Sequence, residues 1–164
     1  GSKRLDAALL HAFDKLRPVR IRAGALGADL PARDLYVSQQ HRVLVDSKIA
    51  RRMFGEAEIL VAAKHLTGMT GIEIDDSHQP LEYFHLLFDR HEIVCSEGAQ
   101  TESLFTGPEA LKSLGPAARD EILTIFPELR DLGFVPDMAR PCPSGRHARK
   151  LAARHIRNHK PLVA

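Results

Sequence analysis

The chain is organised around one stretch, Tyr83-Phe84-His85-Leu86-Leu87-Phe88-Asp89-Arg90-His91-Glu92-Ile93-Val94-Cys95. Its residues alternate between two sides, a pattern typical of an extended strand. One side would carry Phe84, Leu86 and Phe88 and pack on a core. The other side would carry Tyr83, His85, Leu87, Asp89 and His91. Because imidazoles and carboxylates are costly to bury without partners, this second side either meets water or lines a reactive site. We expect a bend near Asp89-Arg90, before a fresh β run.

The overall composition indicates one ordinary globular domain. The 164 residues are 44% hydrophobic and 27% charged, and the formal net charge is +2. No apolar run approaches the roughly 20 residues that span a bilayer. The two cysteines, Cys95 and Cys142, form no CxxC pair, which argues against a structural zinc knuckle. Gly1-Ser2 is a pair that tag removal commonly leaves, and we set it apart.

Hydrophobic spacing and turn residues predict short strands flanked by helices. Residues 6–16 form a predicted amphipathic helix that Asp6 caps and Pro18 ends. Predicted strands follow at 19–22, 35–37, 43–45, 58–61 and 72–74, with one or two helical turns at 47–54. After Gly98 we expect helices, at 107–115, 116–126 and from Ser144 to about residue 159.

This order of elements predicts an α+β fold. Its core is β-rich, built from short antiparallel strands that close partly, and helices flank it at the N- and C-terminal ends. We divide the chain into the tag pair and N-terminal helix at 1–17, the β-rich core at 18–106, and a C-terminal helical extension at 107–164.

Ser38 and His41 stand three residues apart between two predicted strands. At a strand-to-strand bend, a hydroxyl and an imidazole with this spacing can both reach one peptide bond. The imidazole could then protonate a leaving amide nitrogen while the hydroxyl orients the imidazole or the substrate. A polar turn with a solvated His41 is the simpler alternative, and the residues alone leave both open.

Several segments, taken in order, resemble the bacterial hedgehog/intein (Hint) domain. The most specific are DLYVSQQHRVLV at 34–45 and HLLFDRHEIV at 85–94, supported by 19–27, 54–55, 58–66, 97–98 and 102–103. The similarity covers about residues 18–129. It implies a β-rich, horseshoe-like module that processes its own chain. In that family an initial cysteine attacks the preceding peptide carbonyl to form a thioester, assisted by a Thr/Ser-x-x-His motif and a later histidine.

The resemblance assigns Ser38 and His41 to the motif and His91 to the later histidine. The candidate catalytic residues are Ser38, His41, His91, Asp89 and His85. No cysteine precedes Ser38, and no terminal His-Asn pair closes the domain. We therefore expect the C-terminal portion of an autoprocessing domain, inactive as this chain alone, whose partner is its own N-terminal segment or an upstream polypeptide. The resemblance also suggests a secreted or cell-surface bacterial protein.

Two other roles are open to the reactive side chains, a cysteine nucleophile and a metal site. Cys95 lies about 13 Å along the strand from His91, too far for a direct hydrogen bond, so we expect a small core residue. Cys142, between two prolines, is expected to be a loop thiol without a base. Asp89 and His91 could share a cation with His85 and with His41 or His65. The usual ligand spacing is missing, so we expect no metal and no cofactor.

The acid-free C-terminal tail supports two non-enzymatic alternatives. Its basic residues are Arg146, Arg149, Lys150, Arg154 and Arg157, at three- and four-residue steps. We expect this helix to dock by Leu151, Ala152 and Ile156, with its basic face in water. Binding of an anion or nucleic acid is an alternative that the lack of tail aromatics weakens. The other alternative is an interaction module that homodimerises through open sheet edges.

Overall fold

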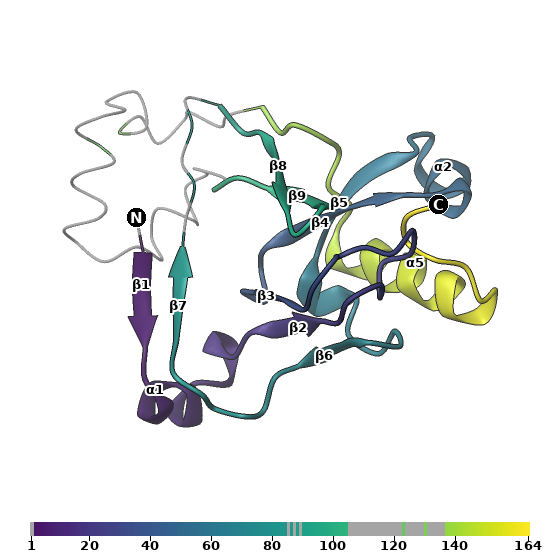
Figure 1. The fold of residues 1–164 in the computed structure, drawn as a ribbon. Helices are drawn as coiled ribbons and strands as arrows, with labels where there is room; N and C mark the ends of the chain where they lie inside the picture. Colours follow the sequence, from purple (N-terminus) through teal and green to yellow (C-terminus); the bar gives the residue numbers. More distant parts are fainter. Residues whose placement is uncertain are drawn as a thin grey trace.

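The described strands of this protein form three separate antiparallel sheets. The computed structural model describes residues 2–84, 86, 88, 90–104, 123, 130 and 137–164. Within them, one sheet pairs β1 with β7, a second has the order β3-β2-β6, and a third has the order β5-β4-β9-β8 (Figure 1). The predicted α+β class, with short antiparallel strands and helices around them, is confirmed.

The third sheet carries the candidate site, and it contains the two longest of the described strands, β4 and β5. It consists of β5 (Glu58–Ala62), β4 (Arg42–Asp46), β9 (Ala99–Glu102) and β8 (Ile93–Ser96). The second sheet consists of β3 (Leu35–Val37), β2 (Val19–Ile21) and β6 (Ile72–Ile74). The first consists of β1 (Ser2–Leu5) and β7 (Leu81–Phe84). All these strands except β1 and β9 lie where the sequence predicts β structure.

The N-terminal helix is shorter than predicted. Asp6 caps it as expected, because its carboxylate accepts the Leu9 N–H at 2.8 Å. The predicted helix 6–16 is instead α1 (Ala7–Ala12) followed by a 3₁₀ turn, η1 (Asp14–Leu16), with Phe13 extended between them. Leu10 is the buried residue of α1, so little tertiary packing supports a longer helix.

The middle helix α2 (Lys48–Phe54) has the predicted bounds. Ser47 caps it by accepting the Ala50 N–H at 3.0 Å, and Gly55 ends it in the left-handed conformation at φ 79°. A second 3₁₀ turn, η2 (Ala63–His65), follows β5 directly. No helix among the described residues is long and apolar enough to cross a membrane.

The prediction that the chain becomes helical after Gly98 is wrong for residues 99–102. Glu97 and Gly98 both have positive φ, 51° and 80°, and form a two-residue turn between β8 and β9. This geometry matches the twist of two antiparallel strands, so the chain returns as a hairpin instead of entering a helix. The helices predicted at 107–115 and 116–126 lie outside the described residues.

The long strand predicted from Tyr83 is also wrong in part. Its ladder with β1 ends at the pair Ser2–Phe84, and the described residues that follow, 86, 88 and 90–92, are not in strands before β8 begins. Ser2, which we set apart as a tag residue, is thus part of the ladder. The expected core-facing side is exposed, with fractions of 74% for Phe84, 56% for Leu86 and 43% for Phe88. The reason is that β7 pairs with β1 and extends away from the other strands (Figure 1).

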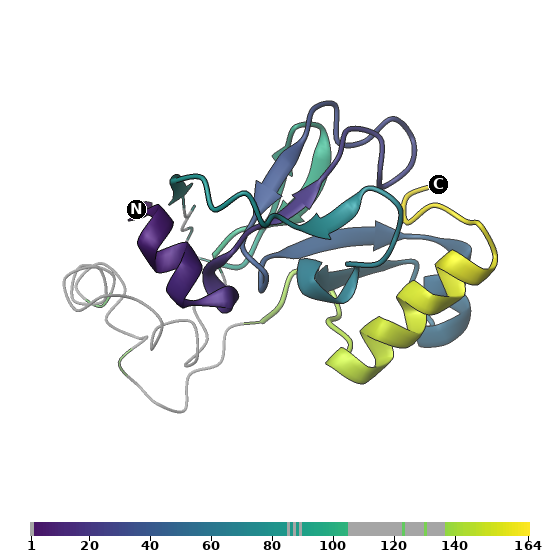
Figure 2. The ribbon, with the colours of Figure 1, turned by 90° about the horizontal axis from the view of Figure 1, so that it is seen from below.

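The last helix, α5 (Gly145–Arg157), is built into the main hydrophobic core. Figure 2 shows it lying along the sheets, next to α2. Leu151 and Ala152 are buried as predicted, but Ile156 is 46% exposed and His155 takes the core position instead. Ser144 precedes the helix, as expected, but makes no side-chain capping bond.

His155 is held in the core as a neutral imidazole. Its Nδ1–H donates to the Lys160 carbonyl at 3.0 Å, and its Nε2 accepts from the Ser47 hydroxyl at 3.1 Å. Burial lowers the pKa of His155, which favours this uncharged form. The Ser47–His155 pair therefore ties α5 to the start of α2.

The tail after α5 returns to the core beside the loop that follows β2. The Val163 N–H donates to the Leu26 carbonyl at 2.8 Å, and the Asp46 N–H donates to the Leu162 carbonyl at 3.0 Å. Leu162 is fully buried. Gly27, at φ +102°, lies so close to this tail that a Cβ atom there would overlap Pro161 and the Val163 carbonyl.

We predict that Gly27→Ala lowers the free energy of unfolding by about 2–4 kcal/mol, because backbone strain and overlap with the tail add together. The matched control is Gly24→Ala, also at positive φ (+76°) but facing open space. It should cost only about 1 kcal/mol. Urea denaturation followed by circular dichroism measures both. Equal losses would show that the tail does not pack against Gly27.

Candidate functional site

The Ser38–His41 turn is held firmly between β3 and β4, as the sequence predicts. The His41 N–H donates to the Ser38 carbonyl at 3.0 Å, closing a tight turn. The Ala63 N–H donates to the His41 carbonyl at 2.9 Å, and the Gln39 carbonyl accepts the Lys64 N–H at 3.0 Å. The backbone of the turn is therefore anchored on η2, and the side chains of Ser38 and His41 are half-buried.

A buried carboxylate, Glu102, connects this turn to His91. Its Oε1 accepts the Arg42 backbone N–H at 2.8 Å, one residue after His41. Its Oε2 accepts from the Arg42 guanidinium at 2.9 Å and from His91 Nε2 at 3.1 Å. Only 7% of the Glu102 side chain is exposed, so these donors replace the water that the carboxylate gave up. Glu102 thus joins β4, β9 and the approach to β8.

These bonds determine the tautomer of His91. Its Nδ1 accepts the Ala139 backbone N–H at 3.1 Å, so the proton resides on Nε2 and points at Glu102. Burial lowers the pKa of His91, and the Glu102 carboxylate partly opposes that effect. The imidazole is therefore neutral at neutral pH, and its Nδ1 serves as an acceptor for a peptide N–H.

Residues 139–142 cross the site and continue along the edge of β5. The Leu60 N–H donates to the Pro141 carbonyl at 2.9 Å, and Arg140 pairs with Glu58 at 2.5 Å. This path brings Cys142 close to Arg42. Burial raises the pKa of the Cys142 thiol, which the Arg42 guanidinium opposes in part, so the group is a neutral thiol and not a ready nucleophile.

The structure brings three of the five predicted site residues to one end of the third sheet. Ser38 and His41 precede β4, and His91 precedes β8, which pairs with the end of β9. His85 and Asp89 lie outside the described residues.

The expectation that Cys95 is a core residue is wrong. Cys95 is exposed, because it is paired with the exposed Gln100 on the side of the hairpin that faces solvent.

Sequence reasoning missed the roles of Glu102 and Arg42. The signal that could have found them is the Glu97-Gly98 turn, because a two-residue hairpin places Glu102 opposite Ile93, two residues after His91. The residue pairing between β4 and β9 then sets Arg42 beside Glu102. Neither pairing follows from local periodicity in the segment itself.

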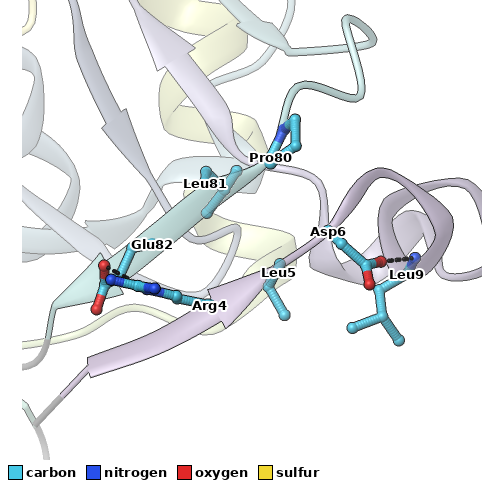
Figure 3. Close-up of a pocket in the computed structure, with 7 residues that line it drawn as sticks. All are labelled: Arg4, Leu5, Asp6, Leu9, Pro80, Leu81 and Glu82. Atoms are coloured by element: carbon cyan, nitrogen blue, oxygen red, sulfur yellow. Dashed lines mark hydrogen bonds and ion pairs between the residues drawn. The ribbon is translucent and has the colours of Figure 1, made fainter.

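Two further features bear on cofactors and ligands. Among the described residues, no three or more His, Cys, Asp or Glu side chains are grouped so that they could hold a metal ion. A pocket of about 470 Å³ lies between β1, α1 and β7 (Figure 3), lined by Arg4, Leu5, Asp6, Leu9, Pro80, Leu81 and Glu82. Its charged groups serve the fold, because Arg4 pairs with Glu82 at 3.1 Å and Asp6 caps α1. None of the lining residues belongs to the candidate site, so this pocket is separate from it.

We predict that Glu102→Gln lowers the free energy of unfolding by about 3 kcal/mol. The glutamine amide lacks the negative charge that offsets Arg42, and its NH₂ group would face the N–H donors of Arg42 and His91 without an acceptor. The control is Glu97→Gln, which breaks a surface pair with Arg33, whose side chain is 80% exposed, and should cost less than about 1 kcal/mol. Urea unfolding of both variants gives the comparison. A loss for Glu102→Gln no larger than the control's would contradict the buried network.

The comparisons with known proteins identify the family. A family model described as "Hint domain" matches residues 1–108, about two thirds of the chain. The match begins at residue 1, ahead of the resemblance seen from residue 18, so it includes β1 and α1, and it also contains Ser38, His41, His91 and Glu102. Searches of curated proteins and of solved structures returned no match. The chain belongs to the Hint-domain family, whose members are autoprocessing-type domains.

Proposed function

We propose that this chain is the C-terminal part of a Hint-type domain that cleaves a peptide bond of its own polypeptide through a thioester. The observation that carries the proposal is the Arg42–Glu102–His91 network, which lies beside the Ser38–His41 turn at one end of a sheet. Family membership supports this class of reaction, and the buried network supports the choice of this end of the sheet as its site.

The reaction needs a thiol, a proton donor and water. A cysteine thiol attacks the carbonyl carbon of the peptide bond before it, so a C–S bond forms, the C–N bond breaks and the freed amine gains a proton. Water then hydrolyses the thioester, releasing a carboxylic acid and regenerating the thiol. No cysteine precedes Ser38, so we assign the thiol to a segment joined ahead of residue 1, and this chain by itself is inactive.

His41 is the group that protonates the leaving nitrogen in this proposal, and Ser38 orients the imidazole or the peptide. The anchored turn supports these roles, since a general acid must keep a fixed position over the scissile bond. His91 acts differently, because its neutral Nδ1 accepts a peptide N–H, as it accepts the Ala139 N–H in the structure. His85 and Asp89 remain candidate residues of the same site.

We predict that His41→Ala slows cleavage about 10²–10⁴-fold, the usual contribution of a general acid. The test uses the full open reading frame, with the native segment ahead of residue 1. Cleavage is followed by gel electrophoresis and mass spectrometry, and added dithiothreitol should accelerate it by attacking the thioester. The matched control is His147→Ala, because His147 is exposed on α5. It should leave the rate unchanged.

Two results would overturn this proposal. One is a full open reading frame that contains an upstream cysteine yet shows no cleavage with or without dithiothreitol. The other is an unchanged cleavage rate after His41→Ala. A reading frame without any cysteine ahead of residue 1 would equally exclude a thioester route through such a residue.

A second candidate function is homodimerisation, and the β1–β7 ribbon favours it. A two-stranded ribbon is marginally stable alone in water, and its strands offer open edges. Phe84 at the end of β7 is mostly exposed, and Leu86 and Phe88 after it are exposed too. A second copy that adds strands to this ribbon would cover both the edge and these side chains.

For this candidate, sedimentation velocity from about 5 to 500 μM protein should show a shift from monomer to dimer. Phe84→Ser should weaken the association at least tenfold, because it removes apolar surface at the ribbon. Phe13→Ser is the control, since Phe13 is also exposed but lies outside the ribbon. A monomer at every concentration would rule this candidate out.

A further inference from the structure

The charge of this chain is segregated, although its net charge is small. Residues 47–55 and 144–164 together contain nine of the 23 Lys and Arg residues and none of the 21 Asp and Glu residues. The rest of the chain consequently has 14 basic against 21 acidic residues. The two acid-free segments hold α2 and α5, which pack against each other.

The basic residues of α5 lie opposite its buried side. At 100° per residue, Arg146, Lys150 and Arg157 fall within a narrow arc, with Arg149 and Arg154 at its borders. The buried residues Ala148, Leu151, Ala152 and His155 occupy the other side. This face spans about 17 Å from Arg146 to Arg157, at 1.5 Å per residue. The expectation of a docked helix with its basic face in water is therefore confirmed in part for α5, since Ile156 is exposed and Arg154 is half-buried.

The structure packs a second basic helix, α2, against α5, a neighbour that sequence reasoning did not include. Lys48, Arg51 and Arg52 are exposed on α2, opposite the buried Ala50. The two helices meet at Phe54 and His147, whose rings are 6.4 Å apart in an edge-on contact. We call the exposed basic residues of α2 and α5 the basic face.

Within the part of the chain that the structure describes, the cations of the basic face are not neutralised by acidic side chains. Among the described residues, none of its Lys or Arg side chains forms an ion pair with an Asp or Glu; the pairs there involve other arginines and His91. Burial lowers the pKa of the neighbouring His65, and the positive charges of Lys64 and Arg149 lower it further. Arg149 belongs to the basic face, so the field of this face reaches His65. Keeping so many like charges together costs stability, so a partner of opposite charge would relieve the repulsion.

The chemistry of the basic face selects among anionic partners. A helix that binds a lipid surface inserts its apolar side into the membrane. In α5 the apolar residues Leu151 and Ala152 are instead buried in the core. A protein partner usually needs an apolar centre in the interface, and Ile156 is the one large exposed apolar side chain described on α5. A polar, arginine-rich face without aromatics instead suits phosphates of a duplex, which presents about ten charges over 17 Å.

We propose that the basic face binds the phosphate backbone of double-stranded nucleic acid without sequence preference. The surface lies on α2 and α5, and α5 is outside the matched family region, so the proposal is independent of self-cleavage. Phosphate contacts supply affinity and no direct sequence information, which fits a face made of Lys and Arg alone.

The test measures binding of the full chain to a fluorescein-labelled 24-base-pair duplex by fluorescence anisotropy. With about four phosphate contacts, the logarithm of the association constant should fall with the logarithm of NaCl concentration at a slope near −4. Arg146→Glu combined with Lys150→Glu should weaken binding at least tenfold and make the slope shallower by about 2. Both positions are exposed, and position 146 lies in the first turn of α5, where an acidic residue favours a helix, so this variant should fold.

The matched control is Lys3→Glu combined with Lys15→Glu, which changes the charge equally at exposed positions of β1 and η1. It should alter affinity less than twofold. Circular dichroism confirms that both variants fold. Absence of binding at 50 mM NaCl, or equal losses in the two double variants, would overturn the proposal. Equal or tighter binding to poly-glutamate, or to phosphatidylserine vesicles, would also overturn it and point to an acidic protein or a membrane.

Discussion

The third sheet and the candidate site depend on one interaction, the burial of the Glu102 carboxylate. A carboxylate removed from water is strongly unfavourable unless donors surround it, and here the Arg42 backbone, the Arg42 guanidinium and His91 all donate to it. Because these donors come from β4 and from the segment before β8, the charge can be satisfied only when three strands are assembled. The cost of burying one group thus makes the end of the sheet cooperative.

A second buried polar contact, between His155 and Ser47, joins α5 to α2 in a similar way. His155 is fully buried, and it is tolerated because the Ser47 hydroxyl and the Lys160 carbonyl satisfy both ring nitrogens. Ser47 also caps α2, so one hydroxyl links a helix start, a buried imidazole and the last helix. The C-terminal residues then close over Gly27, which makes the tail part of the core although it lies outside the matched family region.

Local patterns in the sequence predicted much of this fold. The helical turns predicted at 47–54 located α2, and β-rich runs located β2 to β6, because these signals depend on neighbours within a few residues. The Ser38–His41 spacing likewise located the turn before β4. The predictions failed where the outcome depended on distant pairing, as at β9, where burial was inferred from alternation alone, as at Phe84, and where it was inferred from residue type, as at Cys95.

The sequence by itself determined the α+β class, the place of the Ser-x-x-His turn and the resemblance to Hint domains, because each rests on residue types at short, regular spacing. Only the tertiary structure decided that Glu102 joins His91 to the turn, that His155 is a core residue, and that the basic helices α2 and α5 pack against each other. Each of these joins residues far apart in the chain. The energies of buried charge, hydrogen bonding and packing that select such pairings exist only once the strands and helices are assembled.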